Sequence, residues 1–429
     1  MKKPSDHRPA SSSSFLRSFQ SRNYRLFFSG QAISLMGNWM TTTASMWLAY
    51  KLAASPFHVG LVGFATQIPL LVLAPFTGVT GDRLDRRRLL IGLQVGSMLQ
   101  SAALAAVTLS GNMTISVLVG LSFFQGLINA FEFPTRQSFV AEMVDKREDL
   151  PNAIALNSSM FNIARLLGPA VAGVLINRWS AGVCYAVDAV SYLPVLAGLW
   201  MMRVKPRPPR ERVTKPWEDF RAGLAYVAGE GGLRRPLLLV AVNGLAGFGA
   251  STLASVFAGG VFAGNASMLG HFYSAIGAGA LLSALVLGTR TSVEQLRPWI
   301  VRGTVLVVLS SVVIAVSPSV WVAYVGYFIS GTSVVLVMAG CNTLIQSRVA
   351  DDKRSRVMGL FATAQGVAPI GSLLTGLAAS AWGPRVALGL CAAVMAVAAA
   401  VFAKPRTKPT AGTARAAKAV ETAPLDLEV

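Results

Sequence analysis

The sequence predicts an all-α membrane protein with twelve transmembrane helices, arranged as two parallel repeats of six. Three observations predict this class: an apolar composition, twelve apolar runs of spanning length, and an internal repeat. Hydrophobic residues make up 53% of the 429 residues and charged residues only 13%, which departs strongly from the composition of a soluble domain.

The apolar runs use most of the chain, because a helix needs about 20 apolar residues to cross a bilayer. We predict spans at residues 24–50, 57–80, 89–109, 113–133, 153–177, 182–202, 236–262, 267–288, 299–317, 319–343, 356–380 and 385–403. The spans form an N-terminal bundle (24–202) and a C-terminal bundle (236–403). Outside the membrane we place the N-terminal segment 1–23, a linker with an amphipathic helix (203–235) and a disordered tail (404–429).

The two halves of the chain repeat each other. A shift of 203 residues places Gly168 on Gly371, Gly173 on Gly376, and Trp179 on Trp382. Six spans in each half give both halves the same orientation in the membrane. The repeats are therefore expected to be parallel, related by an axis along the membrane normal.

The formal charge of +19 reports membrane topology rather than nucleic-acid binding. With both termini in the cytoplasm, only Lys51, Arg178 and Arg385 fall in outer loops, as the positive-inside rule requires. The basic inner face also predicts contact with anionic membrane lipids. No nucleic-acid recognition motif accompanies the charge. We expect a monomeric, multi-pass protein of a bacterial plasma (inner) membrane with no nucleic-acid partner.

Motifs for catalysis and ATP binding are absent from the sequence. It contains no phosphate-binding loop, no Gly-x-Ser-x-Gly and no zinc-protease motif. The three cysteines, Cys184, Cys341 and Cys391, lie in apolar runs without metal-ligand spacing. We therefore expect no enzyme activity, no cofactor and no metal site. Transport against a gradient would draw its energy from ions, most simply protons.

The loop between the second and third spans begins at Gly78 and is rich in charge. Asp82 is placed to accept hydrogen bonds from the start of a neighbouring helix. The arginines of the loop, Arg83, Arg86 and Arg87, suit carboxylates or lipid phosphates. We predict a cytoplasmic latch, or gate, in which one of these arginines pairs with Glu132 of the fourth span. The alternative for the loop is a tight cytoplasmic turn with positive-inside arginines. The alternative for Glu132 is an exposed surface carboxylate.

Polar residues within the spans are candidate substrate contacts. Gln31 and Asn38 lie in the first span, Asn243 in the seventh, and Asn162 in the fifth. At this depth a polar group needs a partner inside the protein or a wet cavity. Ordinary hydrogen bonding between helices is the alternative.

The fifth span contains Gly168-Pro169 followed by Gly173. Pro169 removes a helix hydrogen bond and the glycines admit a neighbouring backbone. The span is therefore expected to bend and to pack tightly against another helix.

A charged pair is predicted between the fifth and sixth spans. Arg165 lies about 18 Å into its helix at 1.5 Å per residue, and a charge near the midplane is a functional-site hypothesis. Asp188 in the sixth span lies at a comparable depth. We predict that the two residues form a pair that serves as a substrate or proton site, with a structural ion pair as the alternative.

Several segments resemble a known family. The loop resembles the Gly-x-x-x-Asp-Arg-x-x-Arg-Arg signature of the major facilitator superfamily, at Gly78, Asp82, Arg83, Arg86 and Arg87. Asp85 stands where that signature often has glycine. The Gly168-Pro169 segment resembles the superfamily's antiporter motif. Over about residues 20–403 the chain is similar to the transmembrane secretion effector branch, which includes the enterobactin exporter and macrolide efflux proteins.

The resemblance implies the major facilitator fold and rocker-switch export of a small amphiphile, of drug or siderophore type, coupled to proton entry. Ser122 stands where the fourth-helix motif of the family often has arginine. This departure shifts the expected coupling role to Arg165 and Asp188. A lysophospholipid flippase, an uptake symporter and a non-transporting membrane scaffold are the alternatives.

Overall fold

The computed structural model describes residues 14–83, 85–203, 216–288, 296–350 and 353–403, so the predicted tail lies outside the described residues. The described residues are helical almost throughout and form no strand, which confirms the all-α class. The N-terminal part comprises η1 (Ser14–Gln20), α1 (Arg22–Ala53), α2 (Pro56–Arg83), α3 (Arg86–Leu109), α4 (Ile115–Met143), η2 (Arg147–Asp149), α5 (Leu150–Arg178) and α6 (Ala181–Met201). The C-terminal part comprises α7 (Pro216–Gly229), α8 (Gly231–Val242), η3 (Asn243–Gly247), α9 (Gly249–Thr252), α10 (Ala254–Val256), η4 (Phe257–Val261), α11 (Ala266–Gly288), α12 (Leu296–Val316), α13 (Val320–Gln346), α14 (Arg354–Gln365), α15 (Ala368–Trp382) and α16 (Pro384–Ala403).

Eleven segments of the described chain are long and apolar enough to cross a membrane. They correspond to every predicted span except the first. Polar residues such as Asn38 lower the hydropathy of α1, although this helix has 32 residues. It packs closely along α6, since a Cβ added to Gly30 would lie 2.6 Å from the Cα of Val195. By composition the spans therefore number eleven in the described residues, against twelve predicted.

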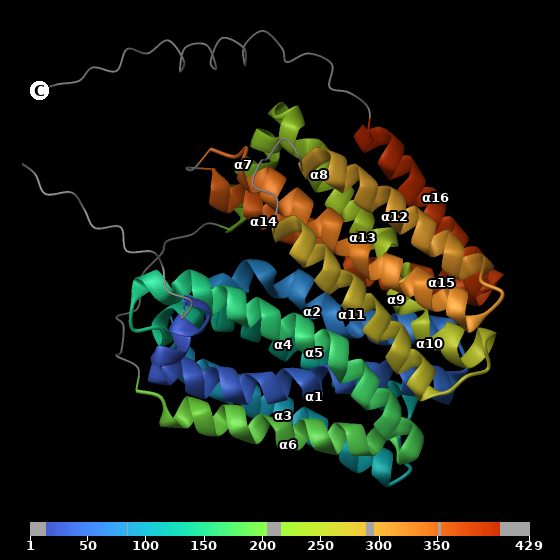
Figure 1. Cartoon of the computed structure of the whole chain (residues 1–429), viewed down its shortest axis with the longest axis horizontal. Coiled ribbons are helices and arrows are strands. Elements are labelled where there is room, and N and C mark those ends of the chain that lie inside the picture. Colours follow the sequence, from blue (N-terminus) through green and yellow to red (C-terminus); the bar gives the residue numbers. More distant parts are fainter. Residues whose placement is uncertain (1–13, 84, 204–215, 289–295, 351–352, 404–429) are drawn as a thin grey trace, which may run out of the picture.

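The long helices lie roughly side by side in two sets (Figure 1). The first set contains α1–α6, and the second contains α8–α16. Because successive helices alternate in direction, Arg86 marks one end of the molecule and Trp179 the other. We call these the Arg86 end, at the left of Figure 1, and the Trp179 end, at the right.

Two of the predicted spans are interrupted. The seventh is broken at η3, a π-helical turn that begins at Asn243. The eleventh is broken between α14 and α15, at Gly366 and Val367. The segments meet where a Cβ added to Gly371 would lie 2.5 Å from the carbonyl oxygen of Gly244. Such breaks are common at functional sites of membrane helices.

Small residues join the two sets at the Trp179 end. On α5 and α11, the Ser267 hydroxyl donates to the Gly173 carbonyl at 3.0 Å, and a Cβ added to Gly173 would lie 2.8 Å from the Cα of Ser267. On α2 and α15, a Cβ added to Gly60 would lie 2.6 Å from the carbonyl oxygen of Ser372. The Phe57 amide donates to the Ser380 hydroxyl at 2.8 Å. We call these two contacts, α5–α11 and α2–α15, the seal.

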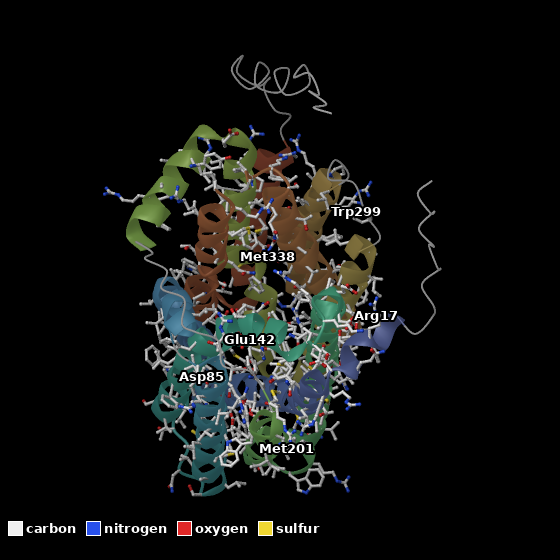
Figure 2. All side chains as sticks on the ribbon, turned by 90° about the vertical axis from the view of Figure 1, so that its left-hand side faces the viewer. Arg17, Asp85, Glu142, Met201, Trp299 and Met338 are labelled. Atoms are coloured by element: carbon white, nitrogen blue, oxygen red, sulfur yellow. The ribbon has the colours of Figure 1, made fainter. Side chains whose placement is uncertain are left out.

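The Arg86 end differs. Among pairs of described residues, every hydrogen bond between the two sets lies between the helix midpoints and the Trp179 end. Figure 2 looks onto the Arg86 end and shows Asp85, Glu142 and Met201 on the first set, with Trp299 and Met338 on the second. The described contacts between the sets are therefore concentrated at the seal.

Candidate functional site

The arginines that open α3 are bound within the first set of helices. Asp85 caps α3 by accepting from the Arg88 amide at 2.9 Å. Arg86 Nη1 lies 2.6 Å from Glu142 Oε1 of α4. Arg87 donates to the carbonyls of Leu199 and Trp200, both at 2.7 Å, at the end of α6. The start of α3 is thus tied to α4 and α6, which makes it a fixed part of the first set.

The remaining residues of the predicted latch lie at the end of α2. Gly78, Asp82 and Arg83 belong to the last turns of α2, and their side chains lie outside the described residues. The predicted capping contact of Asp82 therefore stays a prediction.

The predicted pairing of Glu132 with Arg86 or Arg87 is wrong. Glu132 instead accepts from Arg136 and from Gln94 of α3, each at 3.3 Å. The physical reason is the length of α4, which continues through Pro134 to Met143. Glu132 therefore lies three turns before the end of the helix, and Glu142 occupies the last turn near Arg86. Glu142 lies beyond the predicted fourth span, which ends before Pro134, so the hydropathy pattern does not reveal it as a partner of Arg86.

Asp188 is buried where three helices of the first set meet. Its Oδ2 atom accepts from the hydroxyls of Thr41 on α1 and Ser101 on α3, both at 2.7 Å. Ser191 on the same helix donates to Oδ1 at 3.4 Å. A Cβ on Gly37 would collide with Oδ1, so α1 passes directly over the carboxylate. Only 1% of Asp188 is exposed.

Arg165 has different surroundings. Its guanidinium carbon lies 5.7 Å from the centre of the Trp39 ring of α1. Phe161, one turn earlier on α5, meets the same ring edge-on with the ring centres 5.8 Å apart. Among the described residues no carboxylate or other acceptor lies within hydrogen-bond distance of this guanidinium. The predicted pair with Asp188 is therefore not formed.

Helix α1 explains why the pair is not formed. Gly37 and Thr41 contact Asp188, whereas Trp39 contacts Arg165. Residue 39 is about 200° from residues 37 and 41 around a helix with 3.6 residues per turn. The two charges therefore lie on opposite sides of α1. Helices α5 and α6 are consecutive in sequence, but α1 packs against both and separates them.

One face of α5 is polar towards the Arg86 end and packed towards the Trp179 end. Ser158, Asn162 and Arg165 follow each other at spacings of four and three residues, which places them on one helical face. The same face continues to Pro169 and Gly173, which contact α11 in the seal. The polar residues therefore face the region between the two sets.

The antiporter-like segment serves two contacts. A Cβ added to Gly168 would lie 2.7 Å from the Cβ of Trp39 on α1. Gly173 lies against Ser267 of α11, and the carbonyl of Pro169 faces Gly270. This segment brings α5 close to both neighbours, as the sequence predicts.

The other predicted contacts are scattered. Gln31 is buried, and its Oε1 atom has no hydrogen-bond partner in the described chain. Asn38 is half-buried, in the turn that precedes Thr41. Asn243 is fully buried at the start of η3, and both amide atoms lack a described partner. Only Asn162 lies on the polar face of α5 together with Arg165.

A protein-family model described as transmembrane secretion effector matches residues 13–429. The chain belongs to the transmembrane secretion effector family. It is 27% identical to the staphyloferrin A transporter of Staphylococcus aureus over 380 residues, which cover 84% of this chain and 90% of the relative. It is 21% identical to macrolide efflux protein A of Streptococcus pyogenes, over 83% of this chain and 90% of that protein.

Solved structures share the fold of this family member. A bacterial homologue of the human lysosomal transporter Spinster, solved in an inward-facing and unoccupied conformation, superposes with a TM-score of 0.67 at 14% identity. The match covers 94% of this chain and all of that one. The transmembrane secretion effector described here is therefore a multi-pass transporter of the major facilitator superfamily, and it is not an enzyme.

Proposed function

We propose that this transporter exports a small amphiphilic molecule, of drug or siderophore type, by alternating access coupled to proton entry. The observation that carries the proposal is the seal at the Trp179 end, next to which the polar face of α5 begins. Two sets of helices that are joined at one end, with a polar helix face beside the joint, fit one state of an alternating-access carrier. One relative is named a macrolide efflux protein, which agrees with export, and another is named a staphyloferrin A transporter.

The distribution of basic residues supports a cytoplasmic Arg86 end, with both termini on that side. In this orientation the seal closes the path to the outside, and substrate enters from the cytoplasm. We take residues 24–202 and 236–403 as the two moving bundles and residues 203–235 as their linker. The transporter would act as a monomer in a bacterial plasma membrane.

Asp188 is our candidate for the proton-binding group. Hydroxyl groups both donate and accept hydrogen bonds, so Thr41, Ser101 and Ser191 suit the charged and the neutral carboxyl group alike. Gly37 of α1 lies against the carboxyl group, so protonation of Asp188 would alter its contact with α1. Since Trp39 lies on the opposite side of α1, this helix links the proton site to Arg165.

The latch would hold the cytoplasmic end shut in the opposite state. Arg86 and Arg87 are bound to Glu142 and to α6, so they fix the loop on the first set. We expect Asp82 to reach the second set, where it would cap the start of α14 near Arg356. One charge-assisted hydrogen bond of this kind contributes about 1.5–3 kcal/mol, enough to shift a two-state equilibrium about tenfold or more.

Membrane vesicles of opposite orientation test the proposal. Inside-out and right-side-out vesicles from an overexpressing strain are given a panel of fluorescent amphiphiles and an imposed pH gradient. We expect accumulation in inside-out vesicles with an acidic lumen, and its loss when a protonophore collapses the gradient. Accumulation only in right-side-out vesicles would support an uptake symporter. Movement that ignores the gradient would support a flippase.

A further inference from the structure

Arg165 differs from several other arginines of the described chain. Arg86 and Arg136 pair with glutamates, and Arg385 donates to two backbone carbonyls at 2.8 and 3.1 Å. The guanidinium of Arg165 has an aromatic ring as its neighbour but no acceptor among the described residues. A cation at the midplane of a membrane helix is costly unless an anion or dipole compensates it. Among the described residues, no anion compensates Arg165.

The aromatic neighbours leave the guanidinium able to bind an anion. A guanidinium that lies over the face of tryptophan is held by a cation–π interaction. Its N–H groups lie in its own plane, so they stay available for a bidentate carboxylate. Phe161 extends the apolar wall beside Trp39 and is 38% exposed. The site therefore combines a planar anion receptor with a wall for an apolar ring.

The position of Arg165 connects this site to the seal. A Cβ added to Gly277 of α11 would lie 3.0 Å from the Arg165 carbonyl oxygen. Ser274 of α11 donates to the Leu166 carbonyl at 2.7 Å. In the opposite direction, Asn162 and the exposed Ser158 continue the same helical face. A molecule bound to Arg165 would therefore lie at the inner edge of the seal, next to both sets of helices.

We propose that Arg165, Trp39 and Phe161 form a binding site for an organic anion, in which a carboxylate lies next to a planar apolar group. The inference rests on the proposed transport function and adds the charge class of the substrate. A cationic amphiphile does not fit, because the described polar face of α5 carries a positive charge and no acid. Asp188 cannot supply the acid, since α1 separates it from the site.

Binding to the purified, detergent-solubilised full chain tests this inference without transport. Equilibrium dialysis compares 2-naphthoate with 2-naphthamide, which has the same ring but no charge, and with a naphthyl trimethylammonium cation. The wild-type protein should bind the carboxylate at least tenfold more tightly than either of the others. Arg165→Gln should abolish this preference, and Arg165→Lys should retain part of it because the charge remains but the planar fork is lost.

Arg178→Gln is the matched control, because Arg178 also lies over a tryptophan, Trp179, at 5.8 Å, but at the exposed end of α5. This variant should keep the carboxylate preference. Equal binding of all three probes by wild-type protein, no binding of the carboxylate, or a preference that survives Arg165→Gln in a folded sample would each overturn the inference. Proton-driven export of neutral or cationic amphiphiles alongside such a result would leave the proposed export function standing.

Discussion

Arg165 and Asp188 lie on opposite sides of α1, one over Trp39 and the other against Gly37. Neither charge is neutralised by the other, and each has its own environment: aromatic rings for the arginine and three hydroxyls for the aspartate. Two charged residues that share a membrane depth can therefore serve separate roles.

The proton role of Asp188 is tested by Asp188→Asn. The amide has nearly the same size and can still hydrogen-bond with Thr41 and Ser101, so we expect a folded protein. Without a titratable group, accumulation driven by the pH gradient should fall at least tenfold, whereas exchange of substrate across the membrane without a gradient should continue. Ser101→Ala, which removes one hydroxyl but keeps the acid, is the control. Full gradient-driven accumulation by the asparagine variant would contradict the proton role.

Gly37→Ala should destabilise the first set of helices. Its Cβ would collide with the carboxyl group of Asp188 and lie 2.5 Å from the Ser191 hydroxyl oxygen, and overpacking of this kind costs about 1–3 kcal/mol. Thermal unfolding of the purified protein measures the effect. Gly92→Ala is the matched control, because a Cβ there meets nothing within 4 Å, and alanine is the better helix former by about 1 kcal/mol. Equal midpoints for both variants would exclude the close contact.

The pairing of Arg86 with Glu142, instead of Glu132, gives a double-mutant cycle. Arg86→Gln and Glu142→Gln should show a coupling energy of about 1–3 kcal/mol in the free energy of unfolding, since the pair is short and mostly buried. Arg86→Gln and Glu132→Gln should be additive. Titration with denaturing detergent measures the four free energies of unfolding in each cycle, those of the wild type, the two single variants and the double variant. Additive effects in the first cycle would show that Arg86 and Glu142 do not interact.

The seal should open when a side chain is added to it. In Gly270→Val, the new side chain would meet the Pro169 carbonyl of α5 and separate α5 from α11. If the two sets move as rigid bodies, the α2–α15 contact opens as well. A cysteine at Ser372, which is buried in this contact beside the Gly60 carbonyl, should then react severalfold faster with a membrane-impermeant maleimide applied from outside. The three native cysteines are buried, and Gly389→Val, where a Cβ meets nothing within 4 Å, should leave the rate unchanged.

Asn243 should lower the stability of the folded protein and make the π-helical turn at η3 easier to rearrange. Both of its amide atoms are buried without a described partner, and an unpaired buried polar group costs about 1–3 kcal/mol. Asn243→Leu has a similar volume and should raise the unfolding midpoint while slowing transport, because the π-helical turn at η3 becomes harder to rearrange. A leucine variant that is both less stable and fully active would contradict this role.

The sequence predicts the fold well because each span is read from local composition. The apolar runs place the long helices to within a few residues, apart from α4, whose polar C-terminal turns look like a loop in a hydropathy pattern. The Gly168-Pro169 segment likewise reveals a close contact from local chemistry. Local patterns carry no information on which helices become neighbours in space.

The pairing of charged residues depends on which helices are neighbours, and the two predicted pairs, Arg165 with Asp188 and Glu132 with the loop arginines, are therefore wrong. Arg165 and Asp188 have comparable depths in their helices, but depth does not reveal that α1 lies between them. Glu132 was matched to the loop by its position near the end of a span that in fact continues. Trp39 became recognisable as a partner of Arg165 only once α1 and α5 were in contact through Gly168.

The small-residue seal has a further consequence for salt dependence. It consists of glycine packing and of neutral hydroxyl and amide hydrogen bonds, and such contacts are not screened by dissolved ions. The proposed latch at the opposite end depends on the charge of Asp82, and Coulomb attraction weakens as the Debye length falls to about 3 Å near 1 M salt. If the latch forms, a high ionic strength should weaken it and leave the seal unchanged, so a saline medium should favour the conformation described here.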